Sequence, residues 1–233
     1  MDVLATGGEL GTNEIARRTG VNASTVSRLL ATLAAAGYVD QSANGKYRLG
    51  IRLVQLGNAV VDRLDLRELA RPELERLVEQ VGETATLSVA GGYEAVTVDF
   101  VRSPSSVQGV AQLGRPSVAH ATATGKVLLA HAGIGLPPGP LRRYTTRTIA
   151  DPRALAREVE RVRARGWAEA VGEREGDLAA IAAPVRGSRG ELAAIVGVQG
   201  PTARLDAKAR TAALEPLLAA ALALSTRLGF VED

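Results

Sequence analysis

The N-terminal fold is decided by the stretch Asn13-Glu-Ile-Ala-Arg-Arg-Thr-Gly-Val-Asn-Ala-Ser-Thr-Val-Ser-Arg-Leu-Leu30. It predicts two short helices joined by a tight turn. Gly20 can adopt the left-handed backbone that follows a helix end, and Asn22 is a favoured cap for the next helix. Apolar residues with the spacing i, i+3, i+4 and i+7 predict the buried stripe of that second helix: Val26, Leu29, Leu30 and Leu33.

The opposite face of the second helix is polar, with small or hydrogen-bonding side chains at Ser24, Thr25, Ser27, Arg28 and Thr32. Such a face leaves room for the wall of a DNA groove and supplies donors for bases and phosphates. The helix-turn-helix pattern therefore predicts a DNA-reading surface, to which we add Arg17 and Asn22. The alternative is an ordinary amphipathic hairpin with a solvated face, because polar outer faces are usual on surface helices.

Two short β-prone runs follow this helix, Tyr38-Val39 and Tyr47-Arg-Leu49, and Asn44-Gly45 between them is a strong hairpin signal. A hairpin directly after a helix-turn-helix predicts a winged helix over residues 1–57. Cations on the wing, Lys46 among them, could meet phosphate. The first helix has room only before Gly7-Gly8, which leaves open that the natural chain starts upstream.

Composition narrows the function classes. The 233 residues are 46% hydrophobic and include no cysteine, so a sizeable core is available while disulfides, thiolate metal sites and Cys nucleophiles are excluded. We see no apolar run of roughly 20 residues and no signal peptide, and we expect a cytoplasmic protein with no membrane partner. Residues 1–57 hold six Lys and Arg against four Asp and Glu. Because this charge is modest, we expect an oligomer that doubles the phosphate contacts.

The rest of the chain mixes helical and strand patterns. A connector helix over residues 51–69 precedes a helix over 71–81, where Pro72 suits a first turn. Strand patterns fall at residues 84–90, 93–101, 107–113, 116–121, 167–171, 178–186 and 192–199, and further helices at 124–131, 152–165 and 206–228. Hairpins with helices at intervals predict an α+β fold with a mainly antiparallel sheet. The expected organisation is a winged helix over 1–57, a linker helix over 58–70 and a second domain over 71–233.

Catalytic and metal-binding patterns are missing from the sequence. Gly125-Lys126 resembles the end of a phosphate-binding loop, but Val127 stands where Ser or Thr is needed. The two histidines, His120 and His131, have no partner at metal-ligand spacing. No Gly-x-Ser-x-Gly elbow is present. We therefore predict a protein that is not an enzyme, with no catalytic residues, no metal and no cofactor.

Ten short motifs carry a resemblance to a known family and span nearly the whole chain. They are Glu14-Ile-Ala, Ser24-Thr-Val-Ser-Arg-Leu-Leu-Ala-Thr-Leu33, Gly37-Tyr-Val39, Tyr47-Arg-Leu-Gly50, Leu66-Arg-Glu-Leu-Ala-Arg-Pro72, Gly82-Glu-Thr-Ala-Thr-Leu87, Ala121-Thr-Ala-Thr-Gly-Lys126, Arg163-Ala-Arg-Gly-Trp167, Ile181-Ala-Ala-Pro-Val185 and Gly197-Val-Gln-Gly-Pro201. Each is weak alone, but their order and spacing are specific. On these motifs the chain resembles the IclR family of bacterial transcriptional regulators.

The resemblance implies a winged helix-turn-helix joined by a linker helix to a GAF-like effector-binding domain. It also implies a homodimer, or a dimer of dimers, whose affinity for a double-stranded DNA operator changes when a small organic acid binds. The implied effector residues are Ala123, Thr124, Gly125, Leu178, Ala180, Gly197 and Gln199. Ala170, Ala180 and Gly197 stand where some relatives have Asp, Cys and Ser, which indicates a bulkier or more apolar ligand.

The segment Thr122-Ala-Thr-Gly-Lys126 leads into a helix whose first N–H groups lack partners and can stabilise a carboxylate. Simple capping by Thr122 or Thr124 is the alternative. We expect the acidic cluster of Glu173, Glu175 and Asp177 to be a solvated loop, and the alternative is that it shapes the mouth of the pocket. Two other functions stay open: a small-molecule-binding enzyme, and a protein-interaction adaptor, either with a vestigial DNA-binding domain.

Overall fold

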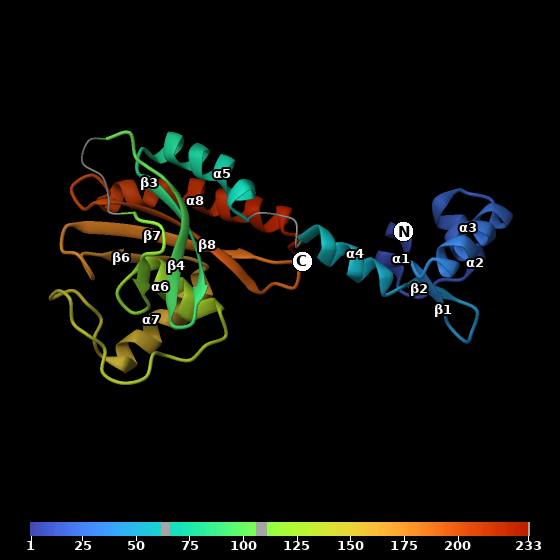
Figure 1. The fold of residues 1–233 in the computed structure, drawn as a ribbon, viewed down its shortest axis with the longest axis horizontal. Helices are drawn as coiled ribbons and strands as arrows, with labels where there is room; N and C mark the ends of the chain where they lie inside the picture. The colour runs from blue at the N-terminus through green and yellow to red at the C-terminus, as the bar shows by residue number, and fades with distance from the viewer. Residues whose placement is uncertain (62–65, 106–110, 233) are drawn as a thin grey trace. The chain divides into compact units, whose positions relative to one another are not determined.

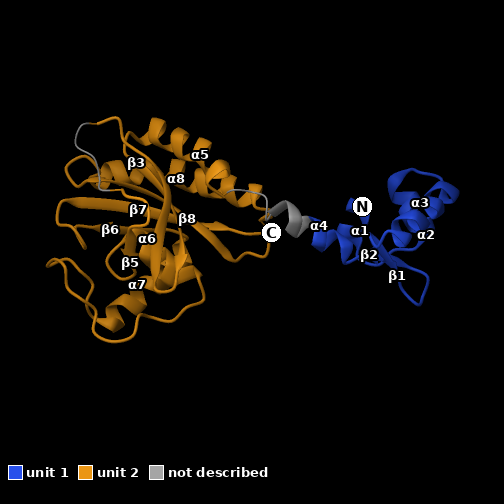
Figure 2. Cartoon of the chain, viewed as in Figure 1, with its two compact units in different colours: residues 1–64 blue, residues 65–233 orange. Residues whose placement is uncertain are grey.

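The computed structural model describes residues 1–61, 66–105 and 111–232. It divides the chain into two compact units, Met1–Leu64 and Asp65–Asp233 (Figure 2). Within the described residues, no helix has both the length and the apolar character needed to cross a bilayer. Each unit has a hydrophobic core of its own, so each is described by itself.

The N-terminal unit is a winged helix, as predicted. It begins with α1 (Asp2–Gly7), α2 (Thr12–Thr19) and α3 (Ala23–Ala35), and a two-stranded hairpin follows, β1 (Val39–Gln41) with β2 (Tyr47–Leu49) (Figure 1). Gly20 ends α2 with a left-handed φ of 71°. Asn22 caps α3 by accepting the N–H of Thr25 at 2.9 Å. The local signals in the sequence therefore set the helix-turn-helix.

The core of this unit confirms most of the predicted α3 stripe. Val26 and Leu30 are buried, and Leu33 packs partly buried against the same cluster. Leu29 was also predicted to be buried, but its side chain is 52% exposed. Neighbouring residues lie about 100° apart around a helix, so a core centred on Val26 and Leu30 leaves Leu29 at its rim.

The wing is a short antiparallel ladder. Val39 pairs with Leu49 and Gln41 with Tyr47, and the isolated bridge from Leu10 to Tyr47 ties the hairpin to the helices. Gly45 supplies the positive φ of 77° that the connecting turn needs.

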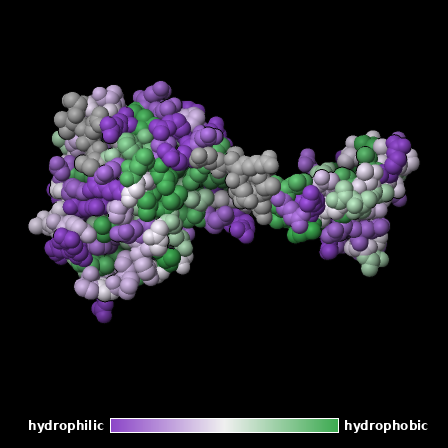
Figure 3. All heavy atoms as spheres, in the orientation of Figure 1, coloured by the Kyte–Doolittle hydropathy of each residue, from purple (hydrophilic) through white to green (hydrophobic). Residues whose placement is uncertain are grey.

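The connector region contains α4 (Arg52–Val61), and α5 (Leu66–Val81) opens the second unit. Residues 62–65 of the expected linker lie outside the described part. Exposed apolar side chains at Ile51, Val54 and Leu56 mark the described start of α4 (Figure 3).

The predicted start of the next helix, at Pro72, is wrong, because α5 begins six residues earlier at Leu66. An internal proline removes one helical hydrogen bond and is costly. Burial of Ala70, Leu74 and Leu77 on α5 offsets that cost.

The C-terminal unit is built on one six-stranded antiparallel sheet. Its strands are β3 (Thr84–Gly91), β4 (Glu94–Val101), β5 (Pro116–Val118), β6 (Ala168–Val171), β7 (Leu178–Arg186) and β8 (Leu192–Pro201), in the spatial order β5-β4-β3-β8-β7-β6. The predicted mainly antiparallel sheet is confirmed. The central pair β3 and β8 places Thr86 opposite Gly197 and Thr84 opposite Gln199.

Two strand predictions fail beside β5. The strand expected over 116–121 ends at Val118, because the chain turns there to enter the next helix. Of the strand expected over 107–113, residues 107–110 lie outside the described part. Residues 111–113 form no strand, since they run into a turn in which Arg115 N–H donates to the Gln112 carbonyl and Gly114 has a φ of 72°.

Helices cover both faces of the sheet (Figure 1). On one face α5 packs beside α8 (Ala207–Arg227), with Leu74, Leu217 and Leu224 in the shared core. On the other face lie α6 (Ala123–His131) and α7 (Pro152–Arg165), with Leu128 and Leu155 buried. This is the layered α+β arrangement expected for a GAF-like domain, and it puts the start of α6 against the sheet.

Candidate DNA-binding surface and effector pocket

The polar face of α3 is open to solvent. Ser24, Ser27, Arg28 and Thr32 are exposed, and Thr25 is half-buried. Within the described residues the Arg28 guanidinium has no hydrogen-bond or ion-pair partner. Asn22 is occupied as the cap, because its Oδ1 also accepts the Ser24 hydroxyl at 2.9 Å. Thr32 Oγ1 donates to the Arg28 carbonyl at 3.1 Å, so it is engaged as well. The face therefore offers the Ser27 hydroxyl and one unengaged cation.

The predicted contact residue Arg17 is engaged elsewhere. Its Nη2 lies 2.7 Å from Glu14 Oε1, and Arg18 Nε lies 2.6 Å from the same oxygen. The hydrogen bonds from Arg17 and Arg18 lower the pKa of Glu14 to about 2. Glu14 thus offsets positive charge on α2, an effect that our sequence analysis missed although the spacings i+3 and i+4 were visible.

The wing carries a second available cation. Lys46 is exposed beside the β1–β2 turn, and its ammonium group has no partner in the part of the chain that is described. Arg48 on β2 lies 3.6 Å from Glu9 and 3.8 Å from Asp40, so it is partly neutralised. Arg28 and Lys46 are the cations best placed to meet phosphate.

The second candidate site is a cavity of about 60 Å³ between the sheet and the start of α6. Six of the seven implied effector residues line it: Ala123, Thr124, Leu178, Ala180, Gly197 and Gln199. Gly125 is not among the lining residues. A Cβ at Gly125 would lie 2.5 Å from the Val118 carbonyl oxygen, so glycine allows α6 to pack against the preceding turn.

The start of α6 combines capping with free donors. Thr122 Oγ1 accepts the Gly125 N–H at 3.0 Å and donates to the Val118 carbonyl at 2.9 Å. Capping by Thr122, the alternative considered above, therefore does occur. The N–H groups of Ala123 and Thr124 lie in the first turn of α6, so they have no partner within the helix. The helix carries a partial positive charge at this end.

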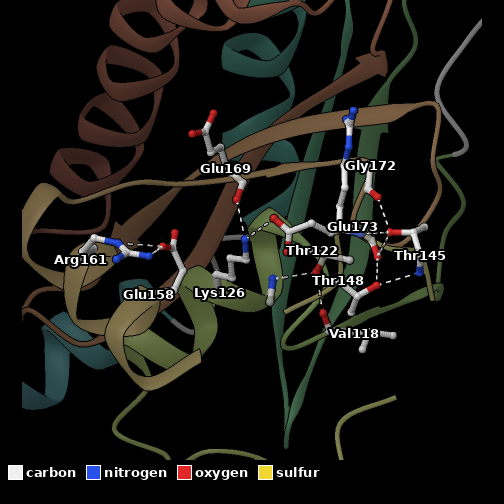
Figure 4. A network of polar contacts seen from close by, with 12 residues as sticks. Val118, Thr122, Lys126, Thr145, Thr148, Glu158, Arg161, Glu169, Gly172 and Glu173 are labelled. Carbon is white, nitrogen blue, oxygen red and sulfur yellow. Dashed lines mark hydrogen bonds and ion pairs between the residues drawn. The ribbon is translucent and has the colours of Figure 1, made fainter. Parts of the chain in front are cut away.

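The acidic cluster is not the solvated loop that we expected. Glu173 and Glu175 both line the cavity, and only Asp177 is exposed. Glu173 Oε1 accepts from Lys126 Nζ at 2.5 Å, and the same ammonium group donates to the Glu169 carbonyl at 2.9 Å (Figure 4). Burial raises the pKa of Glu173, and the Lys126 charge opposes that rise.

The remaining cavity wall is far more polar than expected. Besides the implied residues, its hydrogen-bonding side chains include Thr86, Ser88, Thr97, Gln112, Arg115, Ser117 and Arg174. Arg115 pairs with Glu175 at 2.6 Å, across 60 residues of sequence. The bulkier or more apolar ligand indicated by Ala170, Ala180 and Gly197 stays a prediction, and these three positions alone do not show the polarity of the wall. The buried alternation Thr84-x-Thr86-x-Ser88 was the sequence signal that could have shown a polar face on β3.

Comparisons with known proteins match this architecture. The helix-turn-helix domain of IclR regulators matches residues 1–43, and the C-terminal domain of these bacterial transcriptional regulators matches residues 58–226. The HTH-type transcriptional regulator BhcR of Paracoccus denitrificans is 35% identical over 231 residues, which cover 97% of this chain and 83% of that protein.

Solved structures agree with the sequence comparisons. An IclR transcriptional regulator from a Silicibacter species superimposes with a TM-score of 0.80 at 28% identity, covering 97% of this chain and 90% of the other. An IclR homologue from Microbacterium hydrocarbonoxydans, solved in complex with 4-hydroxybenzoate, gives 0.63 at 29% identity and covers 94% and 91%. The chain belongs to the IclR family of bacterial transcriptional regulators.

Proposed function

We propose that this chain is a transcriptional regulator whose affinity for an operator changes when a small organic acid occupies the cavity of the C-terminal unit. The observation that carries DNA binding is the exposed α3 face with its unpaired Arg28. The cavity at the start of α6 supports the effector part, because helix N-termini favour carboxylates. The complex of a relative with 4-hydroxybenzoate is further support.

The proposed contact set on DNA comprises Arg17, Asn22, Ser24, Thr25, Ser27, Arg28, Thr32 and Lys46. The proposed effector set comprises Ala123, Thr124, Gly125, Leu178, Ala180, Gly197 and Gln199, with Gly125 acting through backbone packing. We further propose a cytoplasmic homodimer or dimer of dimers, because one copy of a modestly charged winged helix would hold DNA weakly. Residues 58–70 would be the linker that carries the effector signal.

The proposed mechanism is a population shift. An effector can move the protein only toward the state that it binds more tightly, so the DNA-competent and DNA-incompetent states must differ at the cavity. Coupling is reciprocal, and operator DNA must change effector affinity by the same factor.

A salt series tests DNA binding directly. Fluorescence anisotropy of the full chain on genomic fragments that it selects should show affinity falling steeply with ionic strength, because bound phosphates release counterions. An adaptor that uses the winged helix on another protein would show no selection of fragments. An enzyme would keep its activity after removal of residues 1–57, whereas a regulator would lose DNA binding.

Gln199→Leu tests the effector part. Gln199 lines the cavity on β8, so we expect the response of DNA affinity to the acid to fall at least tenfold while binding without acid is unchanged. Gln80→Leu, at an exposed position on α5, is the matched control. Loss of both activities together would point to misfolding, and an intact response would remove Gln199 from the effector set.

A further inference from the structure

Three buried polar atoms around the cavity have no hydrogen-bond partner among the described residues: Ser88 Oγ, Gln199 Nε2 and Glu173 Oε2. They belong to β3, β8 and the loop after β6. Two further buried atoms in the described chain share this property, on Asp99 and His131, and neither residue lines the cavity. Because an unpaired buried polar group is unfavourable, their gathering marks a place where a ligand would supply the partners.

Three of the neighbouring polar residues are already paired. Arg174 Nη1 donates to the Pro116 carbonyl at 2.8 Å, and Arg115 is bound to Glu175. Thr122 Oγ1 both donates and accepts within the protein. Among the described residues of the cavity wall, Ser88, Glu173 and Gln199 are the ones that carry a fully buried polar atom without a partner.

The chemistry of these three groups restricts the ligand. The Gln199 amide nitrogen donates, and the Ser88 hydroxyl can donate or accept. The second oxygen of Glu173 accepts in the carboxylate form, which the ion pair with Lys126 at 2.5 Å favours. A ligand hydroxyl can serve all three kinds of partner, whereas a plain aliphatic acid has no donor for Glu173. The ligand carboxylate would lie at the start of α6, where the N–H groups of Ala123 and Thr124 have no partner within the helix.

Resting on the proposed effector site, we infer that the effector is a small hydroxylated carboxylic acid whose hydroxyl group pairs with Glu173 and Ser88. The cavity of about 60 Å³ has room for on the order of five water-sized groups. A chain of about three carbons with one carboxylate and one or two hydroxyls fits this volume and supplies the required hydrogen bonds. Ser88 and Glu173 thereby determine specificity for the hydroxyl group. The start of α6 binds the carboxylate, which all of these ligands share.

Isothermal titration of the full chain with matched acids tests this inference. The pairs are glycerate with propionate, glycolate with acetate, and 4-hydroxybenzoate with benzoate. We expect glycerate to bind at least tenfold more tightly than propionate, a difference of about 1.4 kcal/mol. If the plain acids bind as tightly as their hydroxylated partners, the inference is wrong while the effector site survives. If no acid of the three pairs binds, the effector site and the inference fall together.

Ser88→Ala separates a specific role from a structural one. The Ser88 hydroxyl is fully buried and makes no bond within the described protein, so its removal takes away no internal hydrogen bond and the fold should persist. We expect the preference for glycerate over propionate to fall at least threefold while propionate binding stays unchanged. Ser188→Ala, in an exposed turn outside the cavity, should keep the full preference. An unchanged preference in Ser88→Ala would overturn the assignment of Ser88.

Discussion

The two units present their polar side chains in opposite ways. On α3 they point outward, and Ser24, Ser27 and Arg28 are exposed. Around the cavity they are enclosed, and Ser88 and Thr86 are buried. An exposed array can meet a partner much larger than itself, whereas an enclosed set accepts only a ligand that matches its volume and its hydrogen bonds. The two proposed tasks, reading DNA and sensing a small molecule, therefore place different demands on one chain.

The largest expected effect concerns the exposed array. Arg28→Ala should weaken binding to selected operator DNA by about 1–3 kcal/mol if the guanidinium reads a base, and the anisotropy titration measures this. Arg157→Ala is the matched control, because Arg157 is exposed on α7 and has no partner within the described residues. Equal losses in the two variants would reduce Arg28 to a diffuse electrostatic role.

A second prediction concerns the pH dependence of the C-terminal unit, through a half-buried histidine outside the cavity. Burial first, and then the charges of Arg186 and Arg163, lower the pKa of His131 to about 4. The unfolded chain takes up this proton near pH 6.5, so His131 contributes stability that is present above that pH and is lost as pH falls toward 4. Between pH 7 and pH 5 the C-terminal unit should lose about 1–2 kcal/mol through His131.

Urea unfolding at pH 7 and pH 5 measures this loss of stability. In His131→Leu the loss between the two pH values should be smaller. The chain has only two histidines, and both lie in the C-terminal unit. Histidine titration should therefore leave the unfolding of the N-terminal unit unchanged. The same pH dependence in wild type and His131→Leu would show that other groups cause it.

The smallest expected effect is a gain in DNA affinity. Glu14→Gln should release Arg17 and Arg18 and strengthen DNA binding a few-fold, with the salt slope steeper by about one. Because the pKa of Glu14 is about 2, this carboxylate is charged throughout pH 5–8 and wild-type affinity should not follow its titration. Glu160→Gln breaks a similar ion pair with Arg163 on α7, in the C-terminal unit, and changes the net charge by the same amount. A gain in Glu160→Gln as well would assign the effect to net charge.

The N-terminal unit could be predicted from its sequence because its decisive signals are local. Gly20, Asn22 and the Asn44-Gly45 turn act within a few residues, and the structure uses all three as expected. The failures have tertiary causes. Leu29 is exposed because the core is centred on the neighbouring side chains of α3. Pro72 lies inside α5 because burial of its neighbours outweighs the preference of proline for the first turn of a helix.

The cavity shows where sequence reasoning stops. Lys126 and Glu173 are 47 residues apart, and Arg115 and Glu175 are 60 apart, so no local pattern pairs them. The family motifs located the start of α6 and the ends of β7 and β8. They did not reveal the polar groups of β3 and β4, because those groups face the cavity only once six strands are in register.

The smallest side chains of the cavity wall have a consequence for engineering. Ala170, Ala180 and Gly197 can be altered only by adding atoms, since almost nothing remains to be trimmed. At Gly197 an added methyl would lie 3.0 Å from the Thr86 hydroxyl and 3.4 Å from both the Ile181 carbonyl oxygen and the Thr124 methyl, so all three neighbours oppose a larger side chain there. A designer who wants a biosensor for another metabolite would therefore start from Ala170 or Ala180 and narrow the chamber stepwise.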